Sequence, residues 1–208
     1  MPSSAEAGPV EVTTRSHELR GSALARGVLR LCGWRLGWTG LPARQGVVVV
    51  YPHTSNWDFI WAILAKWGTG FQVTFWGKDT LFRIPLFGRW LYWLGGRPVD
   101  RSSPRGAVGQ MAQALGEARA NDEFMWLALS PEGTRSLTPG WRTGFYNVAL
   151  QAQVPVLIAY IDYGRREVGF DTCWMLSGDR ERDIALFNER LAHRRGYRAA
   201  LASPIRFI

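Results

Sequence analysis

Hydrophobic positions along the chain change repeatedly between short unbroken runs and helical spacing. The run VVVVY at 47–51 has no polar break, which is typical of a strand buried on both faces of a sheet. Residues 57–67 carry apolar side chains at helical spacing and predict a helix. The same alternation predicts further strands at 72–76, 124–129, 155–161 and 167–175, and further helices at 105–120, 143–152 and 180–194. Strands that alternate with helices favour a single α/β domain whose mainly parallel sheet is flanked by helices.

The N-terminal part of the chain has a different pattern. Residues 1–16 are small and polar and predict a flexible leader, so the expected domain covers 17–208. Within this domain, 22–38 predicts an amphipathic helix whose apolar face is formed by Leu24, Val28, Leu31 and Trp38. Such a helix either lies in a lipid interface, with its arginines at the headgroups, or packs on the core as an ordinary surface helix.

Composition excludes several classes of protein. With 47% hydrophobic residues and 11 tryptophans, the chain is not disordered. Its two cysteines, Cys32 and Cys173, are too few for a disulfide framework or an all-cysteine zinc site, and we expect no metal. No stretch reaches the roughly 18 apolar residues of a membrane span. The net charge of +8 favours an anionic partner, either nucleic acid or a membrane surface.

The first candidate site lies where the strand 47–51 meets the helix 57–67. His53 is in the connecting turn and Asp58 is in the first turn of the helix, so the carboxylate can hold one ring nitrogen and leave the other as a base. Such a pair can deprotonate an alcohol that attacks an acyl carbonyl. The alternative is a capping box formed by Ser55 and Asp58, with His53 an ordinary loop residue.

The second candidate follows the strand 124–129, in the segment SPEGTRS at 130–136. Gly133 suits a turn that a ligand approaches closely, and Arg135 can hold a phosphate or carboxylate. Glu132 can bind an acceptor hydroxyl or orient Arg135. The alternative is a plain surface turn with a local ion pair.

The third stretch runs from Gly77 to Arg101 and contains Lys78, one of only two lysines in the chain. Its aromatic run at 82–93 either faces lipid or an acyl tail, or forms a hydrophobic helix buried in the core.

Taken in order, these blocks resemble those of the glycerolipid acyltransferase family typified by 1-acylglycerol-3-phosphate acyltransferase. The blocks are His53-x4-Asp58, then Lys78…Pro85…Gly88…Asp100-Arg101, then Pro131-Glu132-Gly133-Thr134-Arg135, and finally Val154-Pro155-Val156. Arg142 and Gly144 are similar to a K-x-G pattern that follows the third block in that family. Ser130 and Ile158 depart from the usual pattern, which leaves the identity of the acceptor open.

The resemblance implies a role for each matching residue. His53 would be the general base and Asp58 its orienting partner. The acceptor's polar head would be bound by Lys78, Arg101, Glu132, Gly133, Thr134 and Arg135. The implied donor is acyl-CoA or acyl carrier protein, and the implied acceptor is a lysophospholipid such as 1-acylglycerol-3-phosphate, with no covalent acyl-enzyme.

The resemblance also implies a place for the protein. We expect a cytoplasmic protein, peripheral on the inner face of the cell membrane, with no nucleic-acid partner. Two alternatives remain: an acyl-thioesterase, in which water replaces the alcohol, and a non-catalytic lipid or nucleic-acid binding module.

Overall fold

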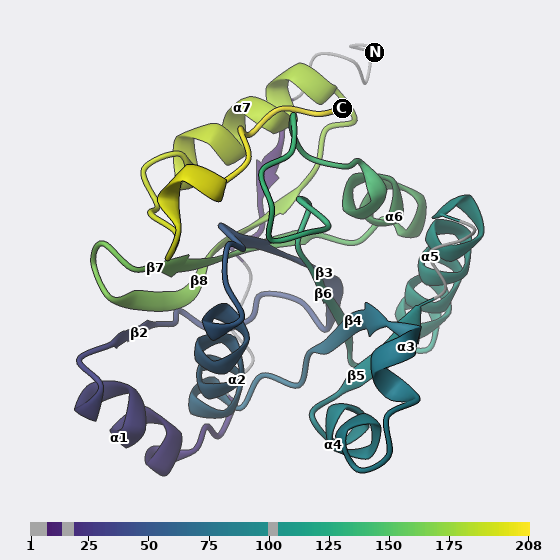
Figure 1. Cartoon of the computed structure of the whole chain (residues 1–208). Coiled ribbons are helices and arrows are strands. Elements are labelled where there is room, and N and C mark those ends of the chain that lie inside the picture. The colour runs from purple at the N-terminus through teal and green to yellow at the C-terminus, as the bar shows by residue number, and fades with distance from the viewer. Residues whose placement is uncertain (1–7, 14–18, 100–103) are drawn as a thin grey trace, which may run out of the picture.

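The sheet at the centre of the protein follows the predicted alternation. A computed structural model describes residues 8–13, 19–99 and 104–208 of the chain (Figure 1). Its strands are β1 (Val10–Glu11), β2 (Arg35–Gly37), β3 (Gln45–Tyr51), β4 (Thr74–Lys78), β5 (Gly96–Val99), β6 (Met125–Leu129), β7 (Val156–Asp162) and β8 (Glu167–Met175). Its helices are α1 (Ala23–Leu31), α2 (Trp57–Thr69), α3 (Asp79–Phe82), α4 (Phe87–Trp93), α5 (Pro104–Ala120), α6 (Gly144–Ala152) and α7 (Arg180–Leu191), with a short 3₁₀ turn at Ala199–Leu201.

The strand order within the described residues is β1-β8-β7-β3-β6-β4-β5, with β2 added beside β8. The pairs that β3 makes with β6 and β7 are parallel, as are those that β4 makes with β5 and β6. Only β7–β8 and β1–β8 are antiparallel among the described pairs. The prediction of an α/β fold with a mainly parallel sheet is therefore confirmed.

Strand β3 explains why the sheet has helices on both faces. Alternate residues of a strand point to opposite sides. Val47, Val49 and Tyr51 enter one core, against side chains of α5, α6 and α7, which include Leu115, Phe145 and Phe187. Val48 enters the other core, against side chains that include Leu29 of α1, Ala65 of α2, Leu157 and Phe170. An unbroken valine run is what such a two-sided strand requires.

The N-terminal segment departs from the sequence prediction in two places. Val10–Glu11, within the segment expected to be a leader, pairs with β8. The helix expected over 22–38 ends at Leu31, because Gly33 takes a φ of +75° and Arg35–Gly37 then pairs with β8 as strand β2. Helix α1 buries Ala25 and Leu29, whereas the expected apolar face, with Leu24, Val28 and Leu31, is exposed.

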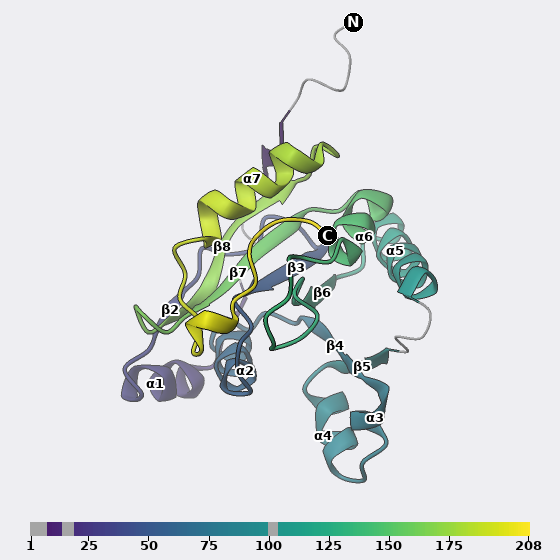
Figure 2. The same cartoon turned by 45° about the horizontal axis from the view of Figure 1, so that its top comes forward.

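Several large apolar side chains stay at the surface. We call these residues the apolar face: Leu24, Val28, Leu31, Trp57, Ile60, Leu86, Phe87, Trp90 and Trp93. They lie on α1, on α2 and in or beside α4, three helices that extend along one side of the sheet (Figure 2). The aromatic run at 82–93 is therefore not a buried core helix. None of the helices in the described ranges has the length and apolarity to cross a membrane.

Candidate active site

Three strand ends meet at one edge of the sheet. Strand β3 lies between β6 and β7, and all three run parallel, so the segments that follow them emerge side by side. Ligands of open α/β sheets bind at this carboxyl edge. The segments are the loop 52–56 before α2, the turn 130–135 after β6, and Tyr163 directly after β7.

The loop after β3 brings His53 and Asp58 together. Asp58 is buried in the first turn of α2, and its Oδ2 accepts hydrogen bonds from the backbone N–H groups of Thr54, at 2.7 Å, and Ser55, at 2.8 Å. The same oxygen lies 3.3 Å from Nδ1 of His53. This distance is slightly longer than a typical N–H···O hydrogen bond.

Half of the alternative capping box is present, because Asp58 accepts the backbone N–H of Ser55, whereas the Ser55 hydroxyl accepts the N–H of Trp57 at 3.2 Å. Asp58 satisfies backbone donors at the start of α2 and also contacts the imidazole. Nδ1 of His53 faces the carboxylate, and Nε2 is the ring nitrogen that Asp58 does not contact. The imidazole is 28% exposed, whereas the Asp58 side chain is only 1% exposed, so the ring reaches solvent and its partner does not.

The other oxygen of Asp58 has a partner that sequence reasoning missed. Oδ1 accepts a hydrogen bond of 2.8 Å from the hydroxyl of Tyr163. Burial raises the pKa of Tyr163, and the bond to Asp58 and its negative charge raise it further, while Trp61 acts in the opposite direction. The hydroxyl therefore stays protonated and donates at neutral pH. The sequence held one signal for this contact. Tyr163 follows the predicted strand 155–161, and the carboxyl ends of neighbouring parallel strands lie at the same edge of a sheet.

Glu132 is a second buried carboxylate near His53. Its Oε2 accepts the backbone N–H of His53 at 2.7 Å, and its Oε1 accepts the backbone N–H of Ser203 at 2.9 Å. Burial raises the pKa of Glu132, and these N–H groups and His53 partly offset the rise. The carboxylate thus ties the His53 loop to the C-terminal segment. Its contact with a substrate hydroxyl stays a prediction.

Tyr51 extends the connection to the C-terminal segment, because its hydroxyl donates to the carbonyl of Ser203 at 3.1 Å. Burial, and secondarily the nearby charge of Glu132, raises the pKa of Tyr51 to about 12. Ser203 was not singled out by the sequence, and nothing in its local pattern marks it.

Two arginines lie at the turn after β6, one within it and one over it. Gly133 has a φ of +68°, and a Cβ there would lie 3.3 Å from Cδ and Nε of Arg142. Arg142 therefore lies directly over the turn. Arg135 donates from Nη1 to Oδ1 of Asn56, the N-cap residue of α2. Thr134 accepts the N–H of Ser136 at 3.3 Å. The turn and the start of α2 are thus in contact through Arg135.

The remaining predicted residues are not brought to His53. Lys78 ends β4 with its side chain exposed, and β6 separates this strand from β3. Arg101 lies outside the described residues. Within the described ranges, no cluster of three or more His, Cys, Asp or Glu side chains is placed to hold a metal ion.

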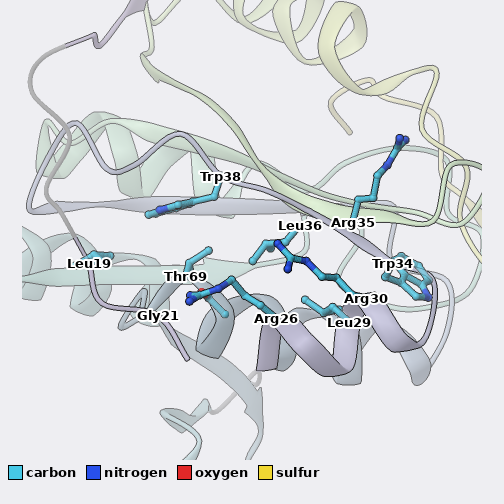
Figure 3. Close-up of a pocket in the computed structure, with 11 residues that line it drawn as sticks. Leu19, Gly21, Arg26, Leu29, Arg30, Trp34, Arg35, Leu36, Trp38 and Thr69 are labelled. Atoms are coloured by element: carbon cyan, nitrogen blue, oxygen red, sulfur yellow. The ribbon is translucent and has the colours of Figure 1, made fainter. Parts of the chain in front are cut away.

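Two pockets lie away from His53. One, of about 440 Å³, lies between α1, β2 and α2, and Arg26 and Arg30 extend into it from α1 while Arg35 points away (Figure 3). Its wall includes Trp34, which stacks on Trp61 with a centroid distance of 4.4 Å. The other, of about 480 Å³, lies between α5 and the strands β4, β5 and β6. Neither of these two pockets is lined by His53 or Asp58.

The arrangement defines a class: an α/β protein with a histidine–carboxylate pair and two arginines at the carboxyl edge of its sheet. Residues 37–162 match the family model described as Acyltransferase. This match covers more than half of the chain, so the protein belongs to the Acyltransferase family. The family expected from the sequence blocks is confirmed at this level.

Comparisons with individual proteins add less. No curated relative matches the sequence. Among solved structures, the chain is similar to the crystal structure of the 1-acyl-sn-glycerophosphate (LPA) acyltransferase PlsC from Thermotoga maritima. The two are 19% identical, with a TM-score of 0.49, and the match covers 80% of this chain and 72% of that chain.

Proposed function

We propose that this acyltransferase moves a fatty acyl group from a thioester, carried by coenzyme A or acyl carrier protein, to the hydroxyl of a lysophospholipid such as 1-acylglycerol-3-phosphate. The observation that carries the proposal is the contact between Nδ1 of His53 and Asp58, which leaves Nε2 as the only free base of the imidazole. This contact lies at the carboxyl edge, beside Arg135 and Arg142.

The proposed chemistry is direct transfer between the two bound substrates. Nε2 of His53 takes the proton of the acceptor hydroxyl as the oxygen attacks the thioester carbonyl. A C–O bond forms, the C–S bond breaks, and the imidazolium returns the proton to the thiolate. Asp58 stabilises the imidazolium in between. A positioned base contributes about 10²–10⁴-fold to such a step. No protein nucleophile is needed.

A phosphate on the acceptor is supported by the charge of the turn after β6. Among the described residues, Arg135 forms no ion pair, and its one hydrogen bond goes to the neutral side chain of Asn56. Arg142 is exposed directly over Gly133. Two guanidinium groups at the edge where His53 lies suit the planar recognition of a phosphate.

We also propose that the protein binds an anionic membrane surface through the apolar face. Two members on different helices, Leu31 and Trp93, are 89% and 71% exposed. Patches of large apolar side chains on a soluble fold commonly mark an interaction site. The exposed cations Arg30 and Arg89 lie on the same helices, α1 and α4, which suits phospholipid headgroups. Trp57 belongs to this face and follows the His53 loop, so lipid and site would be adjacent.

An assay with and without acceptor tests the proposed reaction. Purified protein is supplied with radiolabelled acyl-CoA, or with labelled acyl carrier protein, and with 1-acylglycerol-3-phosphate. We expect one thiol released for each diacyl product, and little release without acceptor. Free fatty acid formed at the same rate with or without acceptor would instead identify a thioesterase. No acyl release, together with a salt-dependent shift of DNA, would favour a binding module.

Vesicle sedimentation tests the membrane contact. We expect binding to vesicles that contain anionic phospholipid, and weaker binding by the double variant Leu31→Ser, Trp93→Ser. Ile208→Ser is the matched control, because Ile208 is also exposed but lies outside the apolar face. Equal binding by all three proteins would contradict the assignment of this face.

A further inference from the structure

The Asp58 carboxylate is held through both of its oxygens. Oδ2 faces His53 and the N–H groups of the loop, while Oδ1 faces the hydroxyl of Tyr163 at 2.8 Å. A carboxylate bonded through one oxygen can still rotate about its χ2 angle. A donor on the second oxygen fixes its plane, and hence the direction in which Oδ2 meets the imidazole.

The ring of Tyr163 is itself held in place. It packs edge-on against Trp34, with a centroid distance of 5.0 Å and an interplanar angle of 88°. On another side it packs against the ring of Tyr197, with a centroid distance of 5.2 Å. The backbone N–H of Tyr163 donates to the carbonyl of Arg195 at 2.8 Å. Since Trp34 in turn stacks on Trp61 of α2, the hydroxyl is placed by the helix that carries Asp58.

We propose that Tyr163 is a positioning residue for acyl transfer, whose hydroxyl orients the Asp58 carboxylate and thereby keeps the His53 ring in its productive direction and tautomer. The inference rests on the proposed role of His53 as the base. Tyr163 acts through Asp58, and the structure shows no contact between Tyr163 and the imidazole.

The same chain provides a matched control. The hydroxyl of Tyr146 donates to Oδ2 of Asp183 at 2.9 Å, and Asp183 is also a buried carboxylate in the first turn of a helix, α7. Asp183 also accepts the backbone N–H groups of Ser177 and Gly178 and the hydroxyl of Ser177, and no histidine lies among these partners. Tyr146→Phe therefore removes an equivalent hydrogen bond without touching the candidate site.

Kinetics of Tyr163→Phe separate positioning from stability. We expect kcat to fall about tenfold or more, the effect of losing one hydrogen bond to a charged group. KM for both substrates should stay within about twofold, because neither substrate loses a contact. Tyr146→Phe should lose comparable thermal stability and keep the wild-type kcat. A kcat for Tyr163→Phe equal to that of Tyr146→Phe overturns the inference.

A double-mutant cycle tests whether Tyr163 acts through Asp58. In the Asp58→Asn background, Tyr163→Phe should cause no further slowing, because the carboxylate that it orients is gone. Full slowing in that background would mean that Tyr163 acts by a different route, and it would contradict the inference.

A measurement without substrate keeps the inference separate from the proposed function. The chain has three histidines, so ¹⁵N NMR can assign His53, with His17 and His193 as internal references. We expect wild-type His53 to carry its proton on Nδ1, and Tyr163→Phe, but not Tyr146→Phe, to lower that tautomer fraction. Unchanged ¹⁵N shifts in Tyr163→Phe would overturn the inference. Absent acyl transfer by the wild type, together with the expected change of tautomer in Tyr163→Phe, would overturn the proposed function but not the orientation of Asp58 and His53 by Tyr163.

Discussion

The starts of helices α2 and α7 are built alike. Each has a buried aspartate in its first turn, Asp58 or Asp183, that accepts backbone N–H groups from the preceding loop and a hydroxyl from a tyrosine. In both tyrosines, burial and the bonded aspartate raise the pKa, so both hydroxyls stay protonated donors. The difference is that only Asp58 also contacts an imidazole.

The comparison separates two roles of an aspartate at a helix start: satisfying backbone donors, and contacting an imidazole. A carboxylate near a helix N-terminus satisfies orphan donors and suits the helix dipole wherever it occurs. At α7 this is all that the contacts of Asp183 accomplish. At α2 the aspartate lies at the carboxyl edge of the sheet, and the placement of His53 brings an imidazole into contact with the same carboxylate.

Replacing each aspartate by asparagine should give opposite results, and this is the largest effect that we expect. In Asp58→Asn the amide oxygen can keep both loop N–H groups while its NH₂ faces the Tyr163 oxygen. Stability is then nearly retained, but the charge that stabilises the His53 imidazolium is lost. We expect kcat/KM to fall by roughly 10²–10⁴-fold.

Asp183→Asn should behave in the reverse way. Its N–H donors bind different oxygens, Ser177 to Oδ1 and Gly178 to Oδ2, so one of them must face an NH₂ group. We expect the free energy of unfolding to fall by about 1–3 kcal/mol, with turnover unchanged. Chemical denaturation and steady-state kinetics measure both variants. Equal loss of turnover in the two would remove the distinction between the helix starts.

Glu132→Gln should show an intermediate effect. Both Glu132 oxygens accept backbone N–H groups, from His53 and from Ser203, and glutamine has only one acceptor. One donor is left facing an NH₂ group, so we expect unfolding to become easier by about 1–3 kcal/mol. Because one of these donors is the N–H of His53, kcat should also fall, by about tenfold, as the loop shifts. Wild-type kcat with a lowered Tm would show that Glu132 serves stability alone.

Arg135→Ala should have a smaller effect than the aspartate and Glu132 variants, and the effect should be limited to acceptors that carry a phosphate. At α7 the N-cap Asp179 is paired with Arg182 at 3.4 Å, whereas Arg135 at α2 binds the neutral Asn56 and forms no ion pair with any described residue. We expect the KM of a phosphate-bearing acceptor to rise about tenfold, the effect of one charge-assisted hydrogen bond. Turnover of a phosphate-free lysolipid should be unchanged. An equal change with both acceptors would argue against phosphate recognition by Arg135.

Features that depend on contacts between residues close in sequence could be predicted, whereas features that depend on contacts between distant residues could not. The valine run of β3 and the spacing of His53 and Asp58 are local, and the structure has the strand and brings the two side chains together. Strand β5 was missed because its sequence, GRPV, contains both glycine and proline, and only pairing with β4 makes it a strand. The Tyr163 hydroxyl reaches Asp58 across 105 residues of sequence, a contact that no local pattern contains.

The burial of a helix also depends on residues that are distant in sequence. Apolar periodicity predicted an apolar face for 22–38, but the position of that face depends on what lies beside the helix. The structure buries Ala25 and Leu29 of α1 and exposes Leu31. Helical spacing of apolar residues is the same whether a stripe meets a core or a lipid surface.

The most direct test of the account is the turnover of His53→Ala, with His193→Ala as the matched control. His193 is an exposed histidine beyond the end of α7, outside the candidate site. Acyl transfer is measured for both variants after circular dichroism has shown that they are folded. We expect His53→Ala to lose at least about 10²-fold in kcat, and His193→Ala to keep the wild-type rate. Wild-type turnover by a folded His53→Ala protein would contradict the central claim.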